Sequence, residues 1–542
     1  MTDERGGMTI SRRDLLKAGV GAAALVAMPR PLVAYFGGRP EPVPPIRDVR
    51  IKELAFRAIE AAQDAGAAYA DVRLTHKRRR VVDQNVFNTL DREELAAGVR
   101  VLVDGYWGFA SSPVWSPEEM VRLGREAVEH AKANALGVTR AVELAARPVV
   151  VDEHWRTPVE IDPFSVSPYE IADHLRGLQV FISRHGRFTA GETRYTMELK
   201  AQAFACSDGA YVTQELIGSE GLLVLSYRPR AGEEVRWPLD GLGRAGVGWE
   251  LFKGQPIRER IERLMEEMKE HAALPAKAVE VGRYQVVCDA EAVARLIDAT
   301  LAAATELDRA FGYEADAGGT TYVTDPLGMV GALQVASPML TLSANRSEPG
   351  GAATVGWDDE GVRPEEVTLV REGVLVDFQT TRESATWLAD YYGRNGRPVA
   401  SRGCAWAESG IHAPLQRRPN LVVSPGPGDL DFEGAVAGVG NGIAVRGLEI
   451  DVDFQGLNGI GFGDRVYEVK NGTRVARILG AGFLFRAPEL WKGLVALGGA
   501  RSSERFGMES VKGQPEQRAG HSVTAPVAVF EQFTVVDALR KA

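Results

Sequence analysis

The sequence has few of the residues that build disulfide frameworks or histidine metal sites. Its three cysteines, Cys206, Cys288 and Cys404, lie far apart and form no CxxC pair. Neither a disulfide framework nor a thiolate metal cluster is therefore indicated, and buried apolar thiols are expected, with one disulfide left open if the protein is exported. No two of the eight histidines are three to five residues apart. This spacing excludes a compact pair of histidine ligands on one helix.

The sequence also lacks an excess of positive charge. It has 73 acidic against 63 basic side chains and a formal net charge of -10. This balance argues against general binding to nucleic acids or to anionic membranes. A single basic run, HKRRR at residues 76–80, is expected on a solvated strand edge, and His271, which follows several glutamates, is expected on a solvated helix face.

The N-terminal segment contains the only pattern of a targeting signal. Arg12 and Arg13 lie in SRRDLLK, which resembles the twin-arginine export motif, and the apolar run at residues 18–28 is too short to span a bilayer. We expect export by the twin-arginine route to the periplasm or another extracytoplasmic space. After removal of the signal, the chain is not expected to be an integral membrane protein.

The remaining sequence has the length and composition of two or three globular domains, since 45% of all residues are hydrophobic and 25% charged. Residues 1–45 are assigned to the signal and a proline-rich linker, 46–147 to an N-terminal domain, 148–275 to a central domain and 276–542 to a C-terminal domain. The alternation of helical and strand patterns predicts an α+β fold with mixed sheet and helices in the N-terminal part. The C-terminal part is expected to be a curled antiparallel sheet or partial barrel with one internal helix.

The segment from Glu291 to Thr320 combines a helical pattern with a dense polar cluster. Apolar residues at helical spacing predict a buried or half-buried helix from Ala292 to Ala304. A cluster of polar residues follows and ends at Gly318-Gly319. Such a cluster is typical of a groove lining, and the residues expected to line a peptide groove are Glu306, Asp308, Arg309, Tyr313 and Glu314.

Five stretches closely resemble the TldD/PmbA family of metallopeptidases. They are TELDRAFGYEA at 305–315, GAAYADVRL at 66–74, GVRVLVDGYWGFASS at 98–112, an RMPN-type segment at 417–420, and FGMESVKGQPEQ at 506–517, which resembles the CGKGQP-like region of TldD-like members. The resemblance implies a zinc-dependent HExxxH helix. It also implies a peptide bound as an added strand, and pairing of a metal-bearing subunit with one that lacks HExxxH.

The chain departs from the family pattern at every position that would hold zinc. Asp298 and Ala303 stand at the two histidine positions, Ala299 at the general-base glutamate and Ser510 at the cysteine ligand. Alanine has no lone pair, and one carboxylate falls short of the three protein ligands of a catalytic zinc. The sequence therefore predicts a TldD-like member with a degraded HExxxH motif, in which no catalytic residue and no zinc are expected.

Three functions remain as hypotheses. The first is a non-catalytic subunit of an exported peptide-processing complex, a heterodimer with a zinc-bearing paralogue. The second is an active metallopeptidase with other ligands, for example Asp298 with Glu306 or Asp308 and the distant His521. The third is a standalone scaffold, a homodimer that binds extended peptides.

Overall fold

The computed structural model describes residues 43–85, 88–136, 141–254, 256–316, 318–463 and 465–539. Arg12 and Arg13 lie outside these residues. Residues 46–542 form one compact unit. Within the described ranges, no helix is both long enough and apolar enough to span a membrane.

The first sheet is built mainly from long antiparallel strands in the order β3-β2-β1-β5-β6-β4, with β7 added to β6. Its strands are β1 (Tyr69–Asp83), β2 (Asn88–Val103), β3 (Tyr106–Ser112), β4 (Val151–Arg156), β5 (Phe188–Cys206), β6 (Tyr211–Tyr227) and β7 (Val235–Pro238). A tight Asp104-Gly105 turn joins β2 to β3, and both residues adopt positive φ. Strands β1 to β3 precede the predicted domain boundary between residues 147 and 148, and β4 to β7 follow it. Strands on both sides of this boundary therefore belong to one sheet.

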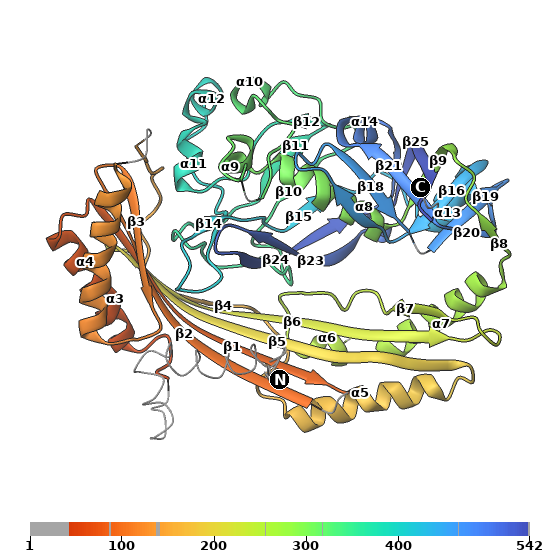
Figure 1. Cartoon of the computed structure of the whole chain (residues 1–542), viewed down its shortest axis with the longest axis horizontal. Coiled ribbons are helices and arrows are strands. Elements are labelled where there is room, and N and C mark those ends of the chain that lie inside the picture. The colour runs from red at the N-terminus through yellow and green to blue at the C-terminus, as the bar shows by residue number, and fades with distance from the viewer. Residues whose placement is uncertain are drawn as a thin grey trace, which may run out of the picture. The chain divides into compact units, whose positions relative to one another are not determined.

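Helices cover this sheet through two apolar clusters. Helix α3 (Val49–Asp64) and helix α4 (Pro117–Asn134) pack together at one end of the sheet, on β1 to β3 (Figure 1). Helix α5 (Pro168–Ser183), α6 (Glu250–Lys253) and α7 (Ile257–Ala273) contribute to a second cluster at the other end. In each of the long helices the buried residues recur every three to four positions. Burial of this apolar stripe against the sheet stabilises the helix.

Two of the predictions for surface positions are wrong: the basic run is not on a strand edge, and His271 is not on a solvated face. The basic run lies on β1, which is paired on both sides by β2 and β5, so it is not on an edge. Its arginines form ion pairs with acidic side chains of these neighbouring strands, as in the pair between Arg78 and Asp91 at 2.8 Å. His271 is 8% exposed and packs against Trp237 and Tyr467, because it lies on the inward face of α7.

The C-terminal half contains two larger sheets and a short two-stranded ladder, β13-β14. One sheet has the order β17-β18-β21-β25-β9-β16-β19-β20-β8, with β22 added to β25; the other is β12-β11-β10-β15-β24-β23. The strands are β8 (Ala276–Ala278), β9 (Gly282–Cys288), β10 (Leu342–Ala344), β11 (Val367–Arg371), β12 (Val374–Leu375), β13 (Ala405–Trp406), β14 (Leu415–Gln416), β15 (Leu421–Val423), β16 (Asn441–Arg446), β17 (Glu449–Val452), β18 (Asn458–Phe462), β19 (Arg465–Lys470), β20 (Thr473–Leu479), β21 (Ala481–Arg486), β22 (Leu494–Leu497), β23 (Glu504–Lys512), β24 (Gln517–Ala525) and β25 (Ala528–Asp537). The α+β class with a β-rich C-terminal half is confirmed. The prediction of one internal helix and a purely antiparallel sheet is wrong, because several connections in this half form short helices and β9 pairs in parallel with β16, as β15 does with β24.

Helix α8 (Ala290–Ile297) is the central helix of this half and lies in its main apolar cluster. The shorter helices are α9 (Leu307–Ala310), α10 (Pro326–Met329), α11 (Arg382–Thr386), α12 (Ala389–Arg394), α13 (Phe432–Gly438) and α14 (Ala487–Lys492). The side chain of Asp289 caps α8 by accepting the backbone N–H of Ala292 at 2.9 Å. The predicted buried helix from Ala292 to Ala304 is present, but it is not α-helical throughout, because it contains a π-helical turn, η1 (Asp298–Ala302).

Candidate functional site

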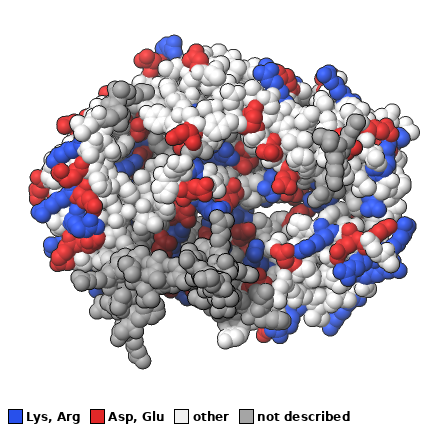
Figure 2. Space-filling model, in the orientation of Figure 1, with Lys and Arg blue, Asp and Glu red and all other residues white. Residues whose placement is uncertain are grey.

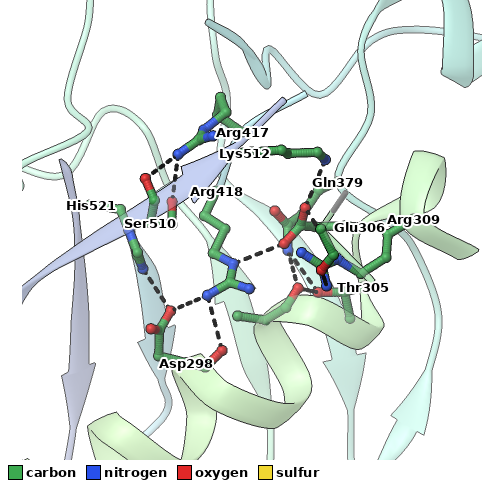
Figure 3. Close-up of polar contacts among 12 residues, drawn as sticks. Asp298, Thr305, Glu306, Arg309, Gln379, Arg417, Arg418, Ser510, Lys512 and His521 are labelled. Carbon is green, nitrogen blue, oxygen red and sulfur yellow. Dashed lines mark hydrogen bonds and ion pairs between the residues drawn. The ribbon is translucent and has the colours of Figure 1, made fainter. Parts of the chain in front are cut away.

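Two of the positions that correspond to metal ligands in the family, Asp298 and Ser510, lie where η1 approaches strands β23 and β24 (Figure 3). Asp298 begins η1, Ser510 lies on β23, and His521 lies on the neighbouring β24, where it is the register partner of Met508. The chain that follows β14 brings Arg417 and Arg418 into the same place. Widened π-helical turns occur frequently at functional sites, and this one presents both the carboxylate and the backbone carbonyl of Asp298.

The guanidinium of Arg418 lies between two carboxylates. Its Nη1 donates to Oδ1 of Asp298 at 2.8 Å and to the backbone carbonyl of that residue at 3.2 Å. Its Nε donates to Oε1 of Glu306 at 2.8 Å. Nε2 of His521 lies 2.7 Å from the same Asp298 oxygen. A fixed positive charge therefore occupies the space between the first ligand position and Glu306.

A second buried cation completes this cluster. Nζ of Lys512 donates to Oε2 of Glu306 at 2.9 Å and to Oδ2 of Asp308 at 2.6 Å. Glu306 and Lys512 are almost fully buried. We call Asp298, Glu306, Lys512 and His521, together with Arg418, the Arg418 network.

The electrostatics of the network favour ionised carboxylates at its centre. Burial alone would raise the pKa of Asp298, but the charges of Arg418 and His521 outweigh it and lower that pKa below the usual range. Burial likewise opposes ionisation of Glu306, and Lys512, Arg418 and Arg309 together hold its pKa well below the usual value. For Asp308, burial dominates and the pKa is raised. The network is therefore a set of buried charges that compensate one another.

The remaining ligand positions carry no comparable donor. Ala299 and Ala303 have only methyl side chains, and Ala303 is 4% exposed. The hydroxyl of Ser510 accepts a hydrogen bond from Nη2 of Arg417 at 2.9 Å, and its backbone carbonyl also accepts from Nη2.

These residues do not fit a catalytic zinc. Oδ1 of Asp298 is already engaged by an arginine and a histidine, and a hydroxyl is a poor zinc ligand compared with a thiolate. Among the described residues, no group of three or more histidine, cysteine or acidic side chains could hold a metal ion. The donor set of this site therefore differs in kind from the one that the family resemblance implies.

The residues predicted to line a peptide groove have different environments. Glu306 belongs to the Arg418 network, Asp308 contacts it through Lys512, and Nη1 of Arg309 donates to the carbonyl of Gly318 at 2.5 Å. Glu314 is buried, and burial raises the pKa of its carboxyl. Tyr313 is 54% exposed, and its ring lies 4.8 Å from that of Trp387. Contact of these residues with a peptide stays a prediction.

A cleft of about 780 Å³ opens beside the network. Strands β1, β2, β5 and β6 of the first sheet contribute to its lining, and Arg346, Arg417, Arg418 and parts of β23 and β24 line it from the C-terminal half. Lysine, arginine, aspartate and glutamate side chains are interspersed over the face of the molecule seen in Figure 2, so neither sign of charge dominates there. Arg418 thus belongs both to the buried network and to the wall of the cleft.

Sequence reasoning missed Arg418 and Lys512 as members of the site. Arg418 is 120 residues from Asp298 along the chain, and Lys512 is 206 residues from Glu306. A signal for Arg418 was nevertheless present. The segment that is RMPN-like in the family reads RRPN here, so a basic residue stands where the family pattern has an apolar one.

Comparisons with known proteins agree with this architecture. Residues 281–537 match the domain described as PmbA/TldA metallopeptidase C-terminal domain, and residues 70–131 match PmbA/TldA metallopeptidase domain 1. A metalloprotease of Methanocaldococcus jannaschii is 22% identical over 407 residues, which cover 73% of this chain and 81% of that protein. A metalloprotease of Methanothermobacter thermautotrophicus is 26% identical over 351 residues, covering 64% and 69% of the two chains.

Two solved structures share the fold. TldE from Thermococcus kodakarensis has a TM-score of 0.65 at 15% identity, and the match covers 90% of this chain and 100% of that one. A protein described as a proposed modulator of DNA gyrase from Thermotoga maritima gives 0.67 at 17% identity, with coverage of 90% and 100%. Together with the two domain matches, these findings identify the chain as a metallopeptidase-like member of the TldD/PmbA family.

Proposed function

We propose that this chain is a metal-free, non-catalytic subunit of an exported peptide-processing complex that it forms with a zinc-bearing paralogue. The observation that carries this proposal is the position of Arg418, whose guanidinium lies 2.8 Å from both Asp298 and Glu306. A dication beside this guanidinium would meet strong repulsion, because the two charges would share one buried site.

The chemistry of the cluster also argues against hydrolysis by this chain alone. Ala299 cannot accept a proton from water, so the family's general-base position is inert. Asp298 and Glu306 have pKa values held low by their cationic neighbours, which makes them weak bases. The network is therefore suited to holding the wall of the cleft rather than to activating a nucleophile.

A role in peptide binding rests on the cleft. It retains a volume of about 780 Å³ next to the network, and ligand sites of 300–1,000 Å³ are usual. The chain has thus lost the donor groups of the metal site but keeps an open space beside them. Export rests on the sequence of the N-terminal segment alone, with Arg12 and Arg13 as its key residues.

Co-purification from the native host tests the complex. A tagged chain should recover a second TldD/PmbA-family protein with an intact HExxxH motif, in a stable ratio across gel filtration. Recovery of the monomer alone would contradict the subunit role, and a homodimer that binds extended peptides would favour the standalone scaffold. Fractionation of the host cells tests export, with Arg12→Lys and Arg13→Lys changed together as the transport-defective control.

A second candidate function is supported by one contact. Nε2 of His521 lies 2.7 Å from Asp298, so two of the alternative ligands proposed from the sequence are adjacent. An active metallopeptidase would then need Arg418 to move away and Glu306 to take its place as a ligand. Peptidase assays with added zinc, manganese or iron test this candidate, and it fails if the protein stays inactive with each metal.

A further inference from the structure

Two buried arginines in the wall of the cleft lack an acidic partner. Arg346 and Arg417 are 3% and 2% exposed, and both line the cleft. Among the described residues, neither forms an ion pair with a carboxylate, although other lining cations do. We propose that these two arginines bind a carboxylate of a peptide that lies in the cleft, an inference that rests on the peptide-binding role proposed above.

The first arginine is held by backbone carbonyls and lies 5.8 Å from the ring centre of Trp406. Nη1 of Arg346 donates to the carbonyls of Gly403 and Ala405 at 2.7 and 3.2 Å, and its Nε donates to that of Ala353 at 3.1 Å. No hydrogen bond of its Nη2 is formed with the described residues. The guanidinium is therefore fixed in direction while part of its donor capacity remains unused.

The second arginine is fixed in the same way. Arg417 donates to the carbonyl and hydroxyl of Ser510 and, through Nη1, to the carbonyl of Gln517 at 3.2 Å. Its Nε is buried and has no hydrogen-bond partner. Burial lowers the pKa of Arg417 to about 10, although the charges of Glu306, Glu314 and Asp308 partly oppose this shift; none of these carboxylates forms an ion pair with Arg417.

Both residues are tied to one short segment, Arg346 through its side chain and Arg417 through its backbone. Arg346 binds the carbonyls of Gly403 and Ala405, and the backbone N–H of Arg417 donates to the carbonyl of the intervening Cys404 at 2.8 Å. Strand β13 pairs there with β14, so the ladder positions both arginines. Two cations that line one cleft from fixed positions offer a preorganised anion site.

Other cations that line the cleft have the acidic partner that Arg346 and Arg417 lack. Lys77 lies 3.3 Å from Glu408, Arg79 lies 3.1 Å from Glu198, and Arg518 lies 2.6 Å from Glu509. Each of these exposed or half-buried cations has an acidic neighbour, whereas the two most buried ones do not. A buried charge without a partner is unfavourable, and a carboxylate brought by a ligand would compensate it.

The ligand that fits is a peptide that presents either its C-terminal carboxylate or an aspartate or glutamate side chain. Guanidinium groups bind carboxylates through paired, charge-assisted hydrogen bonds. A polyanion such as a nucleic acid fits less well, because acidic side chains such as Glu93, Glu220 and Glu408 also line the cleft.

Four pools of degenerate octapeptides, labelled with an uncharged BODIPY dye that has no carboxylate, test the inference on the wild-type protein as isolated from its host. Two pools contain aspartate and glutamate and two do not; within each pair, one pool has a free C-terminus and the other an amide. Fluorescence anisotropy gives a dissociation constant for each pool. We expect the pool without any carboxylate to bind at least about tenfold more weakly than the pool with both kinds, since charge-assisted hydrogen bonds are lost.

The four pools also identify the source of the carboxylate. Loss on amidation alone indicates the C-terminus, and loss on omission of aspartate and glutamate alone indicates a side chain. Equal binding of all four pools would overturn the carboxylate inference while leaving peptide binding intact. Binding of none of the pools would instead count against the peptide-binding role itself.

Variants then assign the effect to the buried arginines. Arg346→Gln should weaken binding of the carboxylate-containing pools about tenfold and leave the carboxylate-free pool unchanged, and Arg346→Lys should recover part of the loss. Arg92→Gln is the matched control, because Arg92 lines the same cleft but is exposed. An equal effect of Arg92→Gln and Arg346→Gln would show general charge attraction and would overturn the assignment.

Discussion

Replacement of Arg418 by methionine should destabilise the protein strongly although it restores the RMPN-type segment of the family. The change removes the cation that lies 2.8 Å from Asp298 and from Glu306, and it leaves both carboxylates where the network holds them. Loss of one partner of a buried ion pair typically costs about 3–5 kcal/mol. We expect a loss in this range near pH 7, softened where His521 and Lys512 still contact the carboxylates.

The reasoning predicts that a second change repairs part of the damage. In the double variant Arg418→Met/Asp298→Asn, one uncompensated charge is gone, so the double variant should be more stable than Arg418→Met alone. Coupling between contacting residues is usually about 0.5–3 kcal/mol. Arg236→Met is the matched control, because Arg236 pairs with Glu192 at 2.7 Å on the surface, where both side chains are about half exposed and the pair is worth about 0–1 kcal/mol.

Thermal unfolding of all four proteins at one fixed scan rate, supported by urea titration followed by tryptophan fluorescence, measures these differences. A fixed scan rate matters because a chain of this size need not unfold in two states. If Arg418→Met unfolds at the same temperature as Arg236→Met, the buried network does not have the energetic role assigned to it.

Three other predictions follow from the structure. In Arg418→Ala, zinc should raise the unfolding temperature, because three donor residues of the Arg418 network then surround an empty space. Wild type should show no shift. A shift that a chelator reverses in both the variant and the wild type would contradict the role assigned to Arg418. Burial lowers the pKa of His271 from 6.5 to about 4, so the folded state binds its proton more weakly than the unfolded state. Protonation of this one side chain should therefore remove roughly 3 kcal/mol of stability between pH 6.5 and 4. His271→Phe should lack this part of the slope in urea titrations at each pH. Ile297→Ala in α8 should cost about 2–5 kcal/mol in the same titrations, while Leu136→Ala, at a side chain that is 91% exposed, should change stability little.

Local sequence patterns were sufficient where local physics decides the structure. The apolar spacing before Asp298 predicted the buried helix α8. The pairs Asp104-Gly105 and Asn471-Gly472 are typical of tight hairpin turns, and their residues do adopt positive φ. The α+β class and the β-rich C-terminal half followed from the same kind of pattern. The family resemblance rested on separated sequence stretches, and the domain matches confirm it.

Local patterns failed where distant residues decide the conformation. The π-helical turn η1 follows α8 without a break in apolar character, so nothing in its own sequence marks it. In the fold, Oγ1 of Thr300 donates to the carbonyl of Leu296 at 2.5 Å and accepts from the indole of Trp491 at 2.9 Å, while Arg418 binds the carbonyl of Asp298. Each of the last two partners lies more than one hundred residues away.

The candidate site, too, was predicted only in part from the sequence. The sequence identified the positions at which ligands are replaced, because alanine and serine lack the donors that zinc requires. It did not identify the cation that lies beside them, because a basic residue in an otherwise matching segment gives no information on what it contacts. Only the fold shows that Arg418 joins Asp298 to Glu306.

Zinc stoichiometry shows whether Asp298 and its neighbours hold a metal while Arg418 is present. The full chain is purified without chelator, incubated with excess zinc, freed of unbound metal by gel filtration and analysed by mass spectrometry of the elements. We predict well under one tenth of a zinc ion per chain, and no change in Asp298→Asn or His521→Gln. About one zinc per chain that is lost in both variants would contradict the account, because it would show that these residues hold a metal in the presence of Arg418.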